Sequence, residues 1–202
     1  MAVQDLTSLA NVKAWLNISV TTDDTLLTRL ITAESVVIQS WLNRQLTSQP
    51  YTETRDGSGA GVGQYEMVFA NYPVTAVSSL TVDGAPIPLS SDGGIQQPGY
   101  GFDATRIWIA PVGSSVDARY SNQYFFTKGR SNVVMAYTAG FAAIPFDIEQ
   151  ACIELIALRY RERDRVGQAS KGMAGETTAF ITKAMTDSIL STISQYRKVV
   201  PV

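Results

Sequence analysis

The sequence predicts an α+β fold: a small helical bundle built from both chain ends, with an inserted antiparallel β lobe between them. Apolar residues recur at helical spacing in the first and last quarters of the 202-residue chain. The middle contains short alternating segments separated by glycine, proline and serine. Because neither helical end can bury its apolar face alone, the two ends must share one core. We therefore expect a helical core of residues 1–46 and 141–202, and a β-rich lobe of residues 47–140.

Two helices are expected before the lobe. Ser8 can cap a short helix over Leu9–Leu16, and Thr22 or Asp23 can cap a long helix that ends at about Asn43. The large apolar residues of the long helix are Leu26, Leu27, Leu30, Ile31, Val37, Ile38, Trp41 and Leu42. They cover an arc of about 160°, which is wider than the ~100° stripe of an ordinary surface helix. We expect this helix to contact more than one partner, within the subunit or across a subunit boundary.

The β lobe is expected to form one small antiparallel sheet with long loops. Asp83-Gly84 is a strong signal for a two-residue hairpin, and Pro86 and Pro88 place its return strand at a sheet edge. The other predicted strands are Tyr65–Phe69, Val77–Val82, Arg106–Ile109 and Asn132–Tyr137, and the predicted loops are Ser90–Gly101 and Pro111–Ser121.

Helical structure is expected again after Pro145. Phe146–Arg165 has a first half that is apolar on almost every side, which is typical of a helix at the centre of a bundle. Gly167–Ala184 is polar and glycine-rich, and we expect it to be a flexible connector. Thr186 or Asp187 can cap a final helix that ends at about Arg197.

Composition argues against several classes of chemistry. The net charge is −2, so the chain lacks the overall basic charge of a nucleic-acid-binding protein. It has no histidine, which removes Ser-His and Cys-His nucleophile systems and the commonest metal ligand. The single cysteine, Cys152, lies in an apolar helical run and is expected to be a buried thiol. We expect no cofactor, no metal and no enzymatic activity.

No targeting or membrane segment is visible. The first residues contain no basic stretch followed by an apolar run, and no apolar run approaches the ~20 residues needed to cross a bilayer. We expect synthesis in a cytoplasm and no membrane association.

Two motifs that suggest chemistry have simpler explanations. Gly57–Gly63 is glycine-rich but lacks the spacing and the following helix of a phosphate-binding loop, so a hairpin loop is favoured. Asp23-Asp24 and the pair Glu162/Asp164 are the carboxylate candidates for a histidine-free hydrolase. Acids in the first turn of a helix are already explained by its dipole. The three tryptophans, Trp15, Trp41 and Trp108, are expected in the core.

The sharpest charge feature is the run of Arg159, Arg161, Arg163 and Arg165. Four arginines in seven residues could bind DNA phosphates. Glu162 and Asp164 lie at helical spacing from them, however, and local pairing would neutralise half of the charge. The alternatives are a salt-bridged exposed helix end, a polar protein–protein contact, and a nucleic-acid-binding module that uses Arg159–Arg165.

Four segments of the chain resemble the head–tail connector (adaptor) proteins of tailed double-stranded DNA bacteriophages. They are Leu6–Leu16 (LTSLANVKAWL), Thr22–Ile31 (TDDTLLTRLI), Tyr137–Pro145 (YTAGFAAIP) with the following Asp147, Ile148 and Ala151, and Tyr196–Val199 (YRKV). Together they cover both helical ends, about half of the chain. The predicted β lobe is larger than the minimal family pattern.

The resemblance implies a structural protein of the virion, at the capsid–tail junction. It implies a homo-oligomeric ring, typically of twelve copies, that lies under the portal protein. Such a ring extends the DNA channel, lets DNA pass without sequence-specific binding, and presents a docking surface for the stopper or tail-completion protein. We expect the β lobe on the outer side of the ring, because a bulky lobe would obstruct a DNA channel.

Within this interpretation we expect two zones to contact the portal. One is the arginine-rich helix end with the connector that follows it, and the other is the C-terminal tail. The tail Val199–Val202 is β-prone and could add a strand to the edge of a partner sheet. The candidate partner-binding residues are Arg159, Arg161, Arg163, Arg165, Arg197, Lys198, Val199 and Val200.

Overall fold

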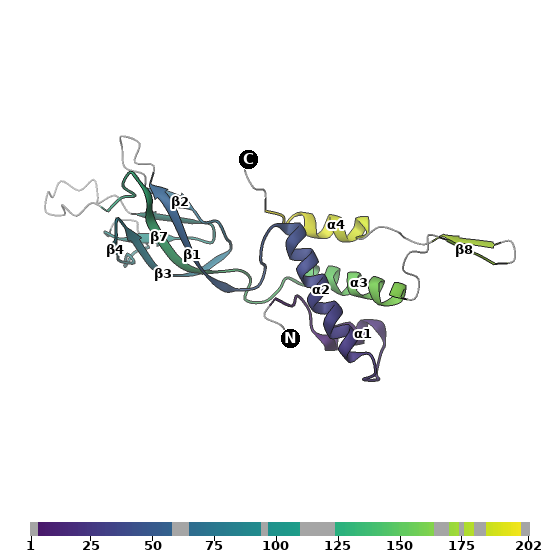
Figure 1. Ribbon diagram of the computed structural model, residues 1–202. Helices are drawn as coiled ribbons and strands as arrows, with labels where there is room; N and C mark the ends of the chain where they lie inside the picture. The colour runs from purple at the N-terminus through teal and green to yellow at the C-terminus, as the bar shows by residue number, and fades with distance from the viewer. Residues whose placement is uncertain are drawn as a thin grey trace, which may run out of the picture. The chain divides into compact units, whose positions relative to one another are not determined.

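The computed structural model describes residues 4–57, 65–93, 97–109, 124–163, 170–173, 176–179 and 185–198. These residues form four helices and nine strands, which confirms the predicted α+β class. The chain divides into two compact units (Figure 1). One consists of Met1–Thr47 and Ala142–Val202 and is called the helical unit below. The other, Ser48–Phe141, is called the β unit.

The helical unit contains α1 (Leu9–Leu16), α2 (Asp24–Leu42), α3 (Phe146–Glu162) and α4 (Asp187–Ser194). Two of the predicted N-caps are confirmed by hydrogen bonds. The side chain of Ser8 accepts from the backbone N–H of Asn11 at 3.2 Å, and that of Thr186 accepts from the N–H of Ile189 at 3.4 Å. Asparagines in left-handed backbone conformation, Asn17 and Asn43, follow α1 and α2, and asparagine tolerates this conformation better than most residues. The predicted ends of both N-terminal helices are therefore confirmed.

Helix α3 is the central element of the helical unit and packs against α1, α2 and α4. Seven of its residues are buried: Ile148, Ala151, Cys152, Ile153, Leu155, Ile156 and Ala157. The Cys152 thiol is fully buried as predicted, and burial raises its pKa to about 12. Among the residues that the structure describes, no helix is long and apolar enough to cross a membrane.

Polar side chains on the buried face of α2 hold the N-terminal segment and the connector after α2. Ser35 accepts a hydrogen bond from the Leu6 N–H at 2.9 Å. Gln39 donates to the Gln4 carbonyl at 3.0 Å and accepts from the Leu46 N–H at 3.1 Å. Because these partners are backbone groups in irregular segments, the side chains satisfy hydrogen bonds that no helix or sheet supplies. The apolar periodicity of α2 did not predict this role.

The β unit contains two antiparallel sheets, so the prediction of a single sheet is wrong. The larger sheet has the strand order β1 (Gln49–Gly57), β7 (Gly129–Ala139), β3 (Val74–Val82), β4 (Ala85–Ile87). The smaller sheet has the order β2 (Glu66–Val68), β6 (Arg106–Ile109), β5 (Tyr100–Phe102). Strands β1 and β5 were not predicted, and β5 overlaps the end of the predicted loop Ser90–Gly101.

The hairpin predicted at Asp83-Gly84 is confirmed and connects β3 to β4. Asp83 and Gly84 both have positive φ, 51° and 78°, as a type I′ turn requires. Strand β4, which contains Pro86, lies at the edge of the larger sheet as expected. The proline therefore occupies a position where one side of the strand has no neighbouring strand to pair with.

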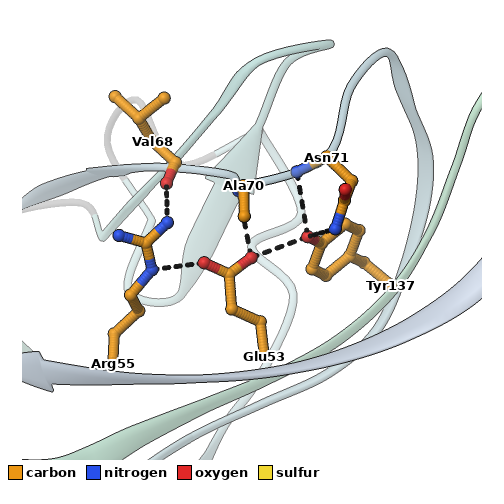
Figure 2. A network of polar contacts seen from close by, with 6 residues as sticks. All are labelled: Glu53, Arg55, Val68, Ala70, Asn71 and Tyr137. Carbon is orange, nitrogen blue, oxygen red and sulfur yellow. Dashed lines mark hydrogen bonds and ion pairs between the residues drawn. The ribbon is translucent and has the colours of Figure 1, made fainter. Parts of the chain in front are cut away.

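A polar network around Tyr137 connects the two sheets (Figure 2). The Tyr137 hydroxyl on β7 donates to Glu53 Oε2 on β1 at 2.6 Å and accepts from the N–H of Asn71 at 3.3 Å. Glu53 also accepts from the Ala70 N–H at 3.0 Å and pairs with Arg55. Since Ala70 and Asn71 follow β2 of the smaller sheet, these bonds fix that segment against the larger sheet. Burial raises the pKa of Tyr137 to about 12, so its hydroxyl stays a donor to Glu53 at neutral pH.

The predicted flexible connector Gly167–Ala184 contains two strands. They are β8 (Ser170–Met173) and β9 (Glu176–Ala179), which pair antiparallel with Ser170 opposite Ala179. A short separation between two strands permits this direct antiparallel pairing. These two strands were not predicted from the sequence.

The prediction that the tryptophans are core residues is wrong for Trp15, which is 52% exposed on α1. Trp41 on α2 is partly buried. Trp108 on β6 is also partly buried, and its indole N–H donates to the Gly93 carbonyl at 3.1 Å. An exposed tryptophan on a helix of the bundle marks a candidate contact surface, because aromatic residues are enriched at protein interfaces.

Candidate protein interface

The end of α3 is fixed to α2 by ion pairs between the two helices. Arg159 Nε lies 3.5 Å from Glu34 Oε1, and Arg163 lies 3.6 Å from Asp23 Oδ2. The Arg163 guanidinium also lies over the Tyr160 ring at 4.5 Å from its centroid, and the Tyr160 hydroxyl donates to Asp23. Two of the predicted partner-binding arginines therefore have acidic partners within the subunit.

These contacts between helices were not predicted from the sequence. The prediction paired Glu162 with Arg159 and Arg165, and Asp164 with Arg161, all on the same helix, and Asp164 and Arg165 lie outside the described residues. The structure shows Arg159 and Arg163 beside carboxylates of α2, because α2 packs along α3 and brings its acids to this end. Carboxylates this close weaken the positive field that a DNA-phosphate site would need.

The acidic pair Asp23-Asp24, a candidate in the hydrolase alternative, makes structural contacts. Asp24 pairs with Lys13 of α1 at 2.6 Å, while Asp23 receives Tyr160 and Arg163. The two carboxylates therefore connect α2 to two different helices. The described parts of the chain also contain no group of three or more side chains suited to hold a metal ion.

Glu34 is the buried acid of the α2–α3 contact. Its residue is 7% exposed, and its Oε2 atom is buried without a hydrogen-bond partner among the described residues. Burial raises the pKa of this carboxyl, and the nearby Arg159 guanidinium opposes part of that rise. Because burying a charge is costly, the Glu34–Arg159 pair contributes little net free energy to folding. Its main effect is to fix the position of α2 relative to α3.

Arg161 faces a different surface from Arg159 and Arg163. It lines a groove of about 230 Å³ between α1, α3 and α4. The other lining residues are Trp15, Glu154, Ala157, Leu158, Thr186 and Ile189. The lining combines apolar side chains with the charged Glu154 and Arg161, a mixture common at protein–protein contacts.

The residues after α4 lie against the C-terminal end of α2. The Arg197 guanidinium lies over the Trp41 ring at 5.0 Å, and the Lys198 N–H donates to the Leu42 carbonyl at 2.9 Å. Tyr196 and Gln195 both donate to Asp147 Oδ2 of α3, at 2.8 and 2.9 Å. The bundle therefore places Lys198 at a fixed point beside α2. Three other predicted contact residues, Arg165, Val199 and Val200, lie outside the described residues.

One flank of α2 is left partly uncovered. Leu27, Ile31 and Ile38 are buried against the other helices, but Val37 is 42% exposed. The residues that share its flank at helical spacing are Leu26, Leu30, Ala33 and Trp41, and each is partly or fully exposed. We call these five residues the α2 flank. It is one side of the wide apolar arc predicted from sequence, and the helical unit does not fully cover it.

Comparison with known proteins places the chain in a family. A family model described as "Head completion protein" matches residues 5–102 and 117–199, which is most of both units. The chain belongs to the head completion protein family. The predicted relationship to head–tail connector proteins of phage-like particles is thereby confirmed. No curated protein matches the chain.

Solved structures from the necks of gene transfer agent (GTA) particles share this head completion protein's fold. A chain in the neck of an empty GTA particle, computed with C6 symmetry, is 20% identical with a TM-score of 0.56. The alignment covers 100% of this chain and 95% of that one. A chain in the neck of a native GTA particle, computed with C12 symmetry, is 16% identical with a TM-score of 0.53, over 100% and 98% of the two chains. Family and fold together support a structural protein of the head–tail neck.

Proposed function

We propose that this head completion protein assembles as a ring beneath the portal of a phage-like particle, extends the DNA channel, and provides the docking surface for the stopper or tail. The observation that carries this proposal is the family match, which spans both units of the chain. The twelvefold symmetry of a neck that contains the same fold supports a ring of twelve copies.

The charges of the helical unit suit a conduit better than a DNA-binding site. The net charge of the whole chain is −2, and in the helical unit Arg159 and Arg163 lie beside carboxylates of α2. A channel wall that attracts DNA strongly would slow its passage, because phosphate contacts supply most non-specific affinity. DNA passing without sequence-specific binding is therefore the expectation for the assembled ring.

Particles assembled without this protein test the function directly. We expect such particles to package DNA, lose it after packaging, and fail to join tails, because the portal opening has no ring to continue and close it. The measurement is the fraction of DNA-filled, tailed particles by electron microscopy, with the protein restored in trans as the control. A normal yield of filled and tailed particles without the protein would contradict the proposal.

The portal contact is proposed at the end of the helical unit that contains Arg197, Lys198, Val199 and Val200. Lys198 is held beside α2, so the residues after it start from a fixed point on the bundle. An extended tail that starts there can pair with a sheet edge of the portal. The segment after α3, including Arg165, is proposed to contact the portal as well, while Arg161 lines the groove beside Trp15.

Deleting residues 199–202 should weaken binding of the protein to the portal by at least about tenfold, because the contacts of the tail with the portal are lost. A tenfold change in the dissociation constant corresponds to about 1.4 kcal/mol of binding free energy. Folding of the helical unit should be unchanged, because the Lys198 and Arg197 contacts remain. Affinity for purified portal and the thermal unfolding curve of the free protein measure the two effects. Unchanged portal affinity would show that the tail contacts something else.

A further inference from the structure

We propose that the α2 flank is the contact between neighbouring copies in the ring, and that it packs against the groove lined by Trp15 on the next copy. This inference rests on the proposed ring and names the two surfaces that build it. The occupant of the α2 flank is thus a second copy of this chain.

Apolar side chains are distributed unevenly around α2. The α2 flank combines Leu26, Leu30, Ala33, Val37 and Trp41 along the helix, and no charged residue of α2 interrupts it. At its C-terminal end the Arg197 guanidinium lies over the Trp41 ring. Val36 lies about 100° around the helix from Val37. It is 43% exposed and stands on a polar side among Arg29, Thr32 and Ser40. An isolated exposed valine needs no explanation, whereas a continuous apolar stripe along a helix is typical of a contact surface.

The symmetry of a ring determines which surfaces its subunits need. A closed ring of identical copies uses heterologous contacts, in which one surface of each copy meets a different surface of the next. The chain therefore needs two complementary apolar surfaces on different sides of the helical unit. The groove with Trp15, which is 52% exposed, is the second such surface of this unit.

The groove and α2 contact different sides of α3. Cys152 and Arg159 face α2, as shown by their contacts with Ser35 and Glu34. Glu154, Ala157 and Arg161 line the groove. At ~100° per residue these two sets point in roughly opposite directions from the axis of α3. The groove and α2 thus lie on opposite sides of the central helix, as a head-to-tail contact between copies requires.

Two adjacent valines give a matched pair of variants. Val37→Asp places a charge in the α2 flank, and Val36→Asp places the same charge on the polar side of the same helix. Both positions are about equally exposed, 42% and 43%, so both variants should fold as the wild type does, which circular dichroism and thermal unfolding check. Burying an unpaired carboxylate between copies is strongly unfavourable.

The assay is the mass distribution of the full-length protein, alone at rising concentration and bound to purified portal. We expect Val37→Asp to raise the concentration for half-maximal ring assembly at least about tenfold, and Val36→Asp to leave it within about twofold of the wild type. On the portal, Val37→Asp copies should bind singly. Rings of Val37→Asp at the wild-type concentration, equal loss in both variants, or loss of portal binding by single copies would overturn the inference. If the wild-type protein itself forms no ring on the portal, the proposed function fails as well.

Mixing two variants tests the groove. Trp15→Ser should block the groove side of the contact, while Val37→Asp blocks the flank side. In a mixture, the intact α2 flank of the Trp15→Ser variant can still bind the intact groove of the Val37→Asp variant. We therefore expect heterodimers in the mixture, and neither dimers nor rings from either variant alone. Absence of heterodimers, with each variant folded, would overturn the assignment of the groove.

Discussion

Replacing Tyr137 with alanine should lower the free energy of unfolding of the β unit by ~3–5 kcal/mol, the range for removing a large buried aromatic side chain. Tyr137 is 1% exposed and packs its ring against Phe69 at 4.6 Å and Tyr51 at 5.7 Å between centroids. Its removal would leave a cavity at the centre of the cluster. It would also leave Glu53 without its hydroxyl donor. Both losses fall on the contact between the two sheets.

Tyr137→Phe separates these two contributions. This variant keeps the ring and removes only the hydroxyl, so we expect a loss of ~1–3 kcal/mol, typical of a buried group that loses its partner. Because Trp108 is the only tryptophan of the β unit, its fluorescence in the Trp15→Phe, Trp41→Phe background reports unfolding of this unit alone. A change below ~1 kcal/mol for Tyr137→Ala would contradict the role assigned to the network in Figure 2.

Replacing Gln39 with alanine should destabilise the helical unit by ~2–4 kcal/mol, since it removes the hydrogen bonds with the Gln4 carbonyl and the Leu46 N–H and leaves that buried N–H without its acceptor. Gln39 is 3% exposed and bridges the Gln4 carbonyl to the Leu46 N–H. Leu46 itself is fully buried. The exposed neighbour Ser40→Ala is the matched control and should change stability by less than ~0.5 kcal/mol.

Hydrogen exchange gives the specific signature of the Gln39 variant. The Leu46 amide should exchange much faster in Gln39→Ala, because its acceptor is lost, while amides in the middle of α3 should lose only the protection that the lower global stability removes. Unchanged exchange at Leu46 would show that another group, rather than Gln39, protects this amide.

The helices could be predicted from the sequence because their signals are local. Ser8 and Thr186 accept from N–H groups three residues further on, so cap and helix start appear within four consecutive residues. Strand β1 could not be predicted in the same way. Its residues Gln49–Gly57 are mostly polar, and the strand exists because it pairs along β7, which is distant in the chain. The three-residue strand β5 is likewise defined by its pairing with β6.

The candidate interface likewise combines features that local sequence predicts with features that depend on packing between distant segments. The wide apolar arc of α2 predicted a second partner, since it depends on the spacing of residues within one helix. Which part of the arc stays uncovered depends on how α1 and α3 pack, and only the structure shows that Val37 is exposed while Ile38 is buried. The ion pairs of Arg159 and Arg163 with α2 also depend on packing between distant segments. Sequence spacing favoured pairs within one helix instead.

The mass of the complex with portal tests most directly whether this head completion protein forms a ring. The mass of the complex between the full-length protein and a purified portal should correspond to a closed ring of copies, twelve for a twelvefold portal, added to the portal mass. A complex that contains only single copies at saturating protein, or no complex at all, would contradict the account.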